Sequence, residues 1–66
     1  LARAAEDGAR LRACLAALEE KNRTGILLAF VGGLSHPQVA ARLEVPLGTA
    51  KAWIRRGLLS LRECLA

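Results

Sequence analysis

A cluster of three basic side chains lies toward the C-terminal end of the sequence. Lys51 lies about one helical turn before the adjacent Arg55 and Arg56, so on a helix the three share one face, with Ala52 between them. Lysine and arginine donate hydrogen bonds to phosphate oxygens and to guanine O6 and N7. An α-helix fits the major groove of DNA, where residues near its N-terminus reach the base edges. The cluster therefore predicts a contact with nucleic acid.

The residues around this cluster predict a long helix with one apolar side. Away from the basic face runs a stripe of apolar and small residues: Leu47, Ala50, Ile54, Gly57, Leu58, Leu61, Cys64 and Leu65. Pro46 is expected to be the first residue of this helix, because its missing N–H costs nothing there. Trp53 lies at the border of the stripe, which favours packing over a contact with DNA or a partner. Arg62 lies about three turns beyond Lys51 and is interpreted as a solvated charge.

The preceding residues predict a shorter helix that is joined to the long one by a tight turn. Ser35 can cap it through its hydroxyl oxygen, and Pro37 suits its first turn. Its apolar residues recur at helical spacing, at Val39, Ala40 and Leu43. The segment Glu44-Val45-Pro46 interrupts it, because a residue before proline is disfavoured in the α region. A short helix, a turn and a longer helix with basic residues near its N-terminus form a helix-turn-helix.

Several short motifs in this region occur together: Gly33-Leu34-Ser35, Val39-Ala40, Pro46-Leu47-Gly48-Thr49, Lys51, Arg55-Arg56 and Leu61-Arg62. With them the chain resembles region 4, the C-terminal domain, of extracytoplasmic-function (ECF) bacterial sigma factors, over residues 11 to 65. Two positions depart from the family pattern. Glu44 replaces a turn glycine, so a non-glycine residue is expected at positive φ, at a cost of roughly 1 kcal/mol. Ala50 replaces a β-branched residue and fills less of the core.

The resemblance implies that the long helix reads the upstream (−35) element of a promoter. Lys51 and Arg55 would donate to guanine, Ala52 would pack on a thymine methyl group, and Arg56 would take a base or a phosphate. Phosphate contacts are expected from Thr49 at the start of this helix. Further phosphate contacts are expected from the shorter helix, at His36, Gln38 and Arg42.

The composition predicts an all-α fold, and together with the resemblance we expect a small four-helix domain with a C-terminal helix-turn-helix. The 66 residues contain one Phe and one Trp, so the core must be built from aliphatic side chains. Residues 1–34 carry five basic and four acidic side chains, whereas residues 35–66 carry five and two. The net charge of +4 is therefore concentrated in the helix-turn-helix half, as expected for a phosphate-binding surface.

The N-terminal residues 1–8 are interpreted as the remnant of a linker, and residues 9–66 as the domain. The sequence contains no Met, so we expect it to be a fragment of a longer protein. Asp7 or Gly8 could cap the first helix. The buried stripe of this helix is expected at Leu11, Cys14, Leu15 and Leu18.

The end of the first helix can be placed in two ways. Propensity favours a break at residues 22–25, where Asn, Thr and Gly form a turn-like cluster. The family resemblance implies an earlier break near Leu18-Glu19, followed by a second helix from about Glu20 to Val31 that Gly32-Gly33 ends. We adopt the second interpretation, because one glycine inside a helix costs only about 1 kcal/mol.

The second helix is apolar nearly all round from residue 26 to residue 31. Burial by the other helices is the favoured explanation, but so small a domain can hardly cover every side. Leu28 and Val31, with Leu59 on the long helix, are therefore predicted to contact a protein partner. The resemblance implies two such partners, the flap of the RNA polymerase β subunit and an anti-sigma factor.

The two cysteines, Cys14 and Cys64, lie far apart in the sequence with no CxxC pair. A zinc site is not expected. Each cysteine lies on the apolar side of its helix, so we interpret both as small core residues rather than as a disulfide or redox pair. No cofactor, metal or small-molecule substrate is expected, because no catalytic triad, carboxylate pair, metal cluster or phosphate loop is present.

Two other functions remain open. The output domain of a response regulator also has a helix-turn-helix, although the Pro46–Thr49 motif and the Arg55-Arg56-Gly57 run favour a sigma factor. A protein-interaction module, bound mainly by an anti-sigma factor, would use the same surface without reading DNA. The sequence carries no membrane span, and the resemblance implies a cytoplasmic protein.

Overall fold

The structure, a computed structural model, describes residues 2–66, and side chains are described from Gly8 onward. It contains α1 (Ala2–Ala17), α2 (Glu20–Ile26), α3 (His36–Leu43) and α4 (Leu47–Leu65). The last turns of α2 continue directly as a π-helix, η1 (Leu27–Val31). Within residues 2–66 there are four α-helices and no strand, so the predicted all-α class is confirmed.

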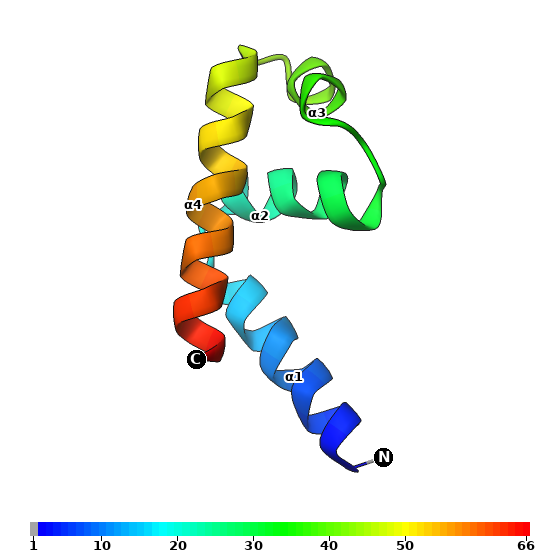
Figure 1. The fold of residues 1–66 in the computed structure, drawn as a ribbon, viewed down its shortest axis with the longest axis vertical. Coiled ribbons are helices and arrows are strands. Elements are labelled where there is room, and N and C mark those ends of the chain that lie inside the picture. Colours follow the sequence, from blue (N-terminus) through cyan, green and yellow to red (C-terminus); the bar gives the residue numbers. More distant parts are fainter. Residues whose placement is uncertain (1) are drawn as a thin grey trace.

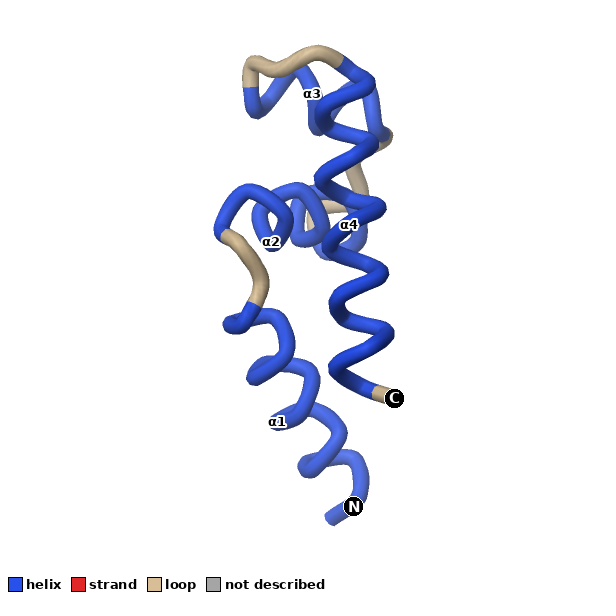
Figure 2. The backbone as a smooth tube through the Cα atoms, turned by 90° about the vertical axis from the view of Figure 1, so that its left-hand side faces the viewer, coloured by secondary structure: helices blue, strands red, loops and turns tan. Residues whose placement is uncertain are grey.

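The long helix α4 is the element on which the other helices pack. Figure 1 shows α1 beside the C-terminal part of α4, α2 crossing its middle and α3 at its N-terminal end. Figure 2 shows from a second side that the three helices follow one another along α4. The result is an elongated domain of about 40 × 20 × 15 Å.

The core consists of two small clusters that share α4. One cluster joins Cys14, Leu18, Ile26 and Leu61, and the other joins Val39, Ala40, Ala50 and Ile54. The predicted stripe of α4 is thus buried at Ala50, Ile54, Gly57 and Leu61. Its other members are exposed: Leu47, Leu58, Cys64 and Leu65. Leu11 was expected in the buried stripe of α1, but it is 42% exposed.

Helix α1 begins earlier than the sequence analysis predicted. A cap at Asp7 or Gly8 is wrong, because the helix runs from Ala2 through both residues. The alanines before Gly8 favour helix strongly enough to offset the roughly 1 kcal/mol that an internal glycine costs. The linker assignment of residues 1–8 stays a prediction.

The predicted break after Leu18 and the second helix from Glu20 are confirmed. The side chain of Arg23 caps the C-terminal end of α1. Its Nη1 donates to the carbonyl oxygens of Leu15, Ala16 and Leu18 at 3.4, 3.4 and 3.3 Å. A cation at a helix C-terminus also interacts favourably with the helix dipole.

The position at which the second helix ends was predicted correctly, but the hydrogen bonding of its last turns was not. It stops at Val31, as expected, and Gly33 has a φ of 70°, which suits glycine. However, the N–H of Gly32 donates to Leu27 O at 2.9 Å and that of Leu34 to Leu28 O at 3.1 Å. The first bond has the i→i−5 spacing of a π-helix, and such π-helical turns often occur at functional sites. The second is donated by a residue beyond the helix and closes its C-terminus after Gly33.

The interpretation of Cys14 and Cys64 as unpaired core residues is wrong. They form a disulfide between α1 and α4, with their Cα atoms 5.9 Å apart. The two helices pack side by side, which brings together cysteines that are separated by 50 positions in the sequence. Nearby, Arg10 Nη2 donates to Leu65 O at 3.0 Å, so a second contact holds α1 to the end of α4.

Candidate nucleic-acid interface

Helix α3 starts with a complete capping box. Ser35 Oγ accepts from the backbone N–H of Gln38 at 3.3 Å, and Gln38 Oε1 accepts from the N–H of Ser35 at 2.8 Å. The predicted Ser35 cap is therefore confirmed. The capping bond occupies the amide oxygen of Gln38 and leaves its NH₂ group free to donate elsewhere.

The turn after α3 has the geometry that the sequence predicted. Glu44 adopts φ 57° and ψ 45°, the left-handed conformation. Its N–H donates back to Ala41 O at 3.2 Å, and the N–H of Val45 donates to Ala40 O at 3.0 Å. These bonds satisfy the last carbonyl groups of α3 and turn the chain sharply into α4.

The contact between α3 and α4 is made by small, fully covered side chains. Val39 and Ala50 are 0% exposed, and Ala40 and Ile54 are 6% and 2% exposed. Because Ala40 and Ala50 are short, the two helices can approach closely. Leu28, Leu43 and Val45 close the edges of this cluster.

The start of α4 differs by one residue from the expectation. Pro46 is the N-cap rather than the first helical residue, since its ψ of 150° is extended. Its carbonyl oxygen accepts from the N–H of Thr49 at 3.0 Å and from that of Ala50 at 3.1 Å. Thr49 is half-buried in this first turn.

The basic cluster is exposed on the N-terminal half of α4. Lys51, Arg55 and Arg56 are exposed, and none of them forms an ion pair with any described side chain. They line a shallow hollow of about 440 Å³ together with Gly48, the half-buried Ala52 and Leu59. The hollow places hydrogen-bond donors around a small apolar surface, an arrangement suited to base edges.

The three α3 residues proposed for phosphate contacts fall into two groups. His36 lines a groove together with Lys51 and Arg55. Gln38 and Arg42 are exposed elsewhere, around a second hollow that Leu34, Ala41 and Glu44 also line. The candidate interface therefore extends from the basic cluster of α4 to His36, with Gln38 and Arg42 beside the turn.

The apolar residues proposed for partner contact are exposed to different degrees. Val31 is 81% exposed and Leu59 is 49% exposed, whereas Leu28 is half-buried against the α3–α4 cluster. Phe30 was not among the residues predicted to contact a partner, and it is 63% exposed. Its position in the same apolar run was the available signal.

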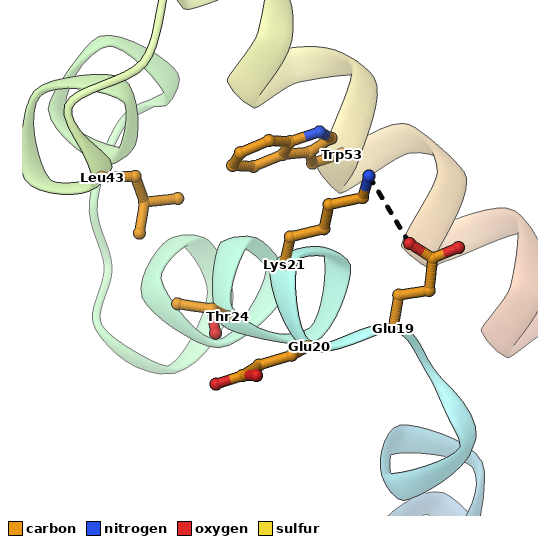
Figure 3. Close-up of a pocket in the computed structure, with 6 residues that line it drawn as sticks. All are labelled: Glu19, Glu20, Lys21, Thr24, Leu43 and Trp53. Atoms are coloured by element: carbon orange, nitrogen blue, oxygen red, sulfur yellow. Dashed lines mark ion pairs between the residues drawn. The ribbon is translucent and has the colours of Figure 1, made fainter.

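Trp53 lies half-buried on the face of α4 turned toward α2, as expected for packing at the border of the stripe. Figure 3 shows its ring above Lys21, whose Nζ lies 5.8 Å from the ring centroid. Lys21 Nζ also lies 3.6 Å from Glu19 Oε2, in an exposed ion pair that contributes little to stability. With Leu43, Thr24 and Glu20 these residues line an open hollow at the junction of α2, α3 and α4.

No helix between residues 2 and 66 is both long and apolar enough to cross a membrane. In the same part of the chain, no group of three or more His, Cys, Asp or Glu side chains is placed to hold a metal ion.

Comparison with known proteins identifies the domain. Residues 8–61 match the family described as "Sigma-70, region 4". The ECF RNA polymerase sigma factor SigK of Mycobacterium tuberculosis is 43% identical over 65 residues, which are 98% of this chain and 35% of that protein. SigE of Mycolicibacterium smegmatis is 41% identical over 59 residues, 89% of this chain and 23% of that protein. This chain thus spans about a third or less of the length of these relatives, and it belongs to the sigma-70 region 4 family, whose fold is an all-α helix-turn-helix domain.

Proposed function

We propose that this domain binds promoter DNA sequence-specifically and reads the −35 element with α4. The observation that carries the proposal is the exposed cluster of Lys51, Arg55 and Arg56 on the first half of a helix that α3 supports. Helix-turn-helix domains place that part of the second helix in the major groove. Family membership supports a DNA-binding role in transcription rather than an enzymatic one, and it favours a sigma factor over a response regulator.

The individual contacts follow from the exposed groups. Arg55 and Lys51 would donate to guanine, Ala52 would face a thymine methyl group, and Arg56 would take a base or a phosphate. The remaining contacts would position the domain on the phosphate backbone: Thr49, His36, Gln38 and Arg42.

We further propose that the domain docks on the flap of the RNA polymerase β subunit, in the cytoplasm, and that an anti-sigma factor regulates it. The names of the relatives support the polymerase as a partner. The exposed side chains of Val31 and Leu59 supply apolar surface for such contacts, while Leu28 is largely covered.

The proposal is tested by selecting short duplexes from a randomised pool and measuring their affinities by fluorescence anisotropy. Arg55→Ala is compared with Arg12→Ala, which removes the same charge from an exposed position on α1. We expect one short motif to be enriched, and Arg55→Ala to lose about 1–3 kcal/mol of discrimination for it. Arg12→Ala should keep the preference.

A parent domain that binds all duplexes equally would overturn the proposal. So would an Arg55→Ala variant with the same preference as Arg12→Ala. Circular dichroism of each variant establishes that a loss of preference is not a loss of fold.

A further inference from the structure

Gly48 is the second residue of α4, and the fold itself does not require a glycine there. Among the described glycines only Gly33 has a positive φ, so Gly48 has a backbone that any residue can adopt. A methyl group added at Gly48 meets no atom within 4 Å, whereas one added at Gly57 would collide with Ile26. Glycine is also less favourable than alanine in a helix. Contacts within the domain therefore give no reason for the missing side chain.

Gly48 lies at the candidate nucleic-acid interface. It is exposed and lines the hollow of about 440 Å³ that contains the basic cluster. Ala52 lies one helical turn further along the same face of α4, and Lys51 and Arg55 lie beside the two small residues. The middle of the hollow is therefore formed largely by the backbone of α4, with hydrogen-bond donors around it.

The absence of a side chain controls how closely this part of α4 can approach a ligand. A glycine lets the backbone come nearer to a bound surface than any other residue does. In a helix-turn-helix complex the N-terminal residues of the second helix are the ones that face the base edges. A side chain at Gly48 would therefore stand between the helix and the base pairs.

Hydrogen bonds to bases tolerate little displacement. Their donor–acceptor distances are about 2.7–3.2 Å, and one additional carbon atom extends the helix surface by about 1.5 Å. An outward shift of that size would lengthen the bonds from Lys51 and Arg55 to guanine beyond this range. Phosphate contacts from flexible side chains at the rim would be affected less.

We propose that Gly48 is a positioning residue for DNA recognition, because its missing side chain lets α4 enter the major groove deeply enough for Lys51 and Arg55 to reach guanine. This inference rests on the proposed function, since it requires α4 to lie in that groove. It also explains why a residue that lowers helix stability occupies the first turn of α4.

The test compares three variants of the 66-residue chain with the parent. Gly48→Ala adds one methyl group in the hollow, and Gly48→Leu adds a larger side chain. Gly8→Ala is the matched control, because Gly8 lies within α1 and a methyl group there makes only an ordinary contact, at 3.8 Å from Arg12 Nη1. Urea unfolding gives the stability of each variant. Fluorescence anisotropy gives its affinity for the selected duplex and for a duplex with the motif scrambled.

We expect Gly48→Ala to change stability and recognition in opposite directions. Both alanine variants should unfold at a higher urea concentration than the parent, because alanine favours the helix. Gly48→Ala should nevertheless bind the selected duplex about tenfold more weakly and the scrambled duplex almost as the parent does. An arginine–guanine pair contributes roughly 5- to 150-fold to discrimination, so tenfold corresponds to partial loss of such contacts. Gly48→Leu should lose more, and Gly8→Ala should keep the parent's affinities.

The positioning role is overturned if Gly48→Ala discriminates between the two duplexes as well as the parent does. It is also overturned if Gly48→Ala is less stable than the parent, because a weaker fold would then explain the loss of binding. These results differ from a failure of the proposed function. A parent without motif preference removes both proposals, whereas a preference that Arg55→Ala loses and Gly48→Ala keeps removes only the role of Gly48.

Discussion

Gly57 of α4 faces Ile26 of α2, and the missing side chain of the glycine is what lets these helices touch. A methyl group added at Gly57 would collide with the Ile26 side chain and lie 3.3 Å from Asn22 O. Ile26 is 5% exposed and belongs to the cluster that joins α1, α2 and α4. The crossing of α2 and α4 thus depends on glycine at this position.

Gly57→Ala is expected to destabilise the domain. The collision should cost about 1–3 kcal/mol, which exceeds the roughly 1 kcal/mol that alanine gains in helix propensity. Gly48→Ala is the matched control on the same helix, because a methyl group there meets nothing within 4 Å. Urea unfolding should show a lower free energy of unfolding for Gly57→Ala and a higher one for Gly48→Ala. Equal stabilisation of both variants would contradict the contact.

Glu44→Gly should stabilise the domain. Glycine adopts a φ of 57° without the steric cost of a Cβ atom, so a gain of about 1 kcal/mol is expected. Glu44→Ala removes the same carboxylate but keeps the Cβ atom, and it should give no comparable gain. Thermal unfolding of the two variants separates the effect of backbone strain from the effect of charge. Similar melting temperatures would mean that backbone strain at Glu44 does not lower the stability of the domain.

Removal of the disulfide should lower stability considerably. Cys14 and Cys64 close a loop with a sequence separation of 50, for which the chain-entropy model gives about 4 kcal/mol. The double variant Cys14→Ser, Cys64→Ser should therefore unfold at a lower urea concentration than the oxidised parent. A reductant should move the parent toward the variant and leave the variant unchanged. If the reductant does not change the urea concentration at which the parent unfolds, the two cysteines are not joined.

Arg42→Ala should weaken DNA binding without changing which sequence is preferred. We assign Arg42 to a phosphate, so its loss should reduce the dependence of log affinity on log salt by about one charge. The affinity for every duplex should fall by a similar factor, whereas Arg55→Ala changes the preferred motif. Titrations at several salt concentrations measure both effects. A change in sequence preference with Arg42→Ala would instead place this side chain on a base.

Local signals in the sequence were sufficient for most of the fold. Ser35 indicated the start of a helix, and the apolar spacing around Ala50 and Ile54 indicated the buried face of α4. Glu44 was expected in the left-handed conformation. Each of these depends on neighbours within one or two turns. The family resemblance decided the break before Glu20, which propensity alone would have placed later.

The features that were missed depend on contacts distant in sequence or on small differences in backbone bonding. No spacing rule connects Cys14 with Cys64, because their proximity arises only when α1 packs on α4. The π-helical turns of η1 use the same residue types as an α-helix. The exposure of Phe30 depends on which side of η1 the other helices cover, and its apolar neighbours in the sequence do not specify that side. The roles assigned to Lys51, Arg55 and Arg56 stay predictions until DNA binding is measured.

The arrangement of the helices around α4 also bears on how the chain folds during synthesis. The ribosome releases α1, α2 and α3 before α4, yet each of them packs its apolar side on that helix. Until α4 emerges, the cluster of Cys14 and Ile26 lacks Leu61, and the cluster of Val39 lacks Ala50 and Ile54. Short helices without tertiary packing are only marginally stable in water. Cooperative folding of this domain therefore waits for α4, and the face that we propose to read DNA is formed in the same step.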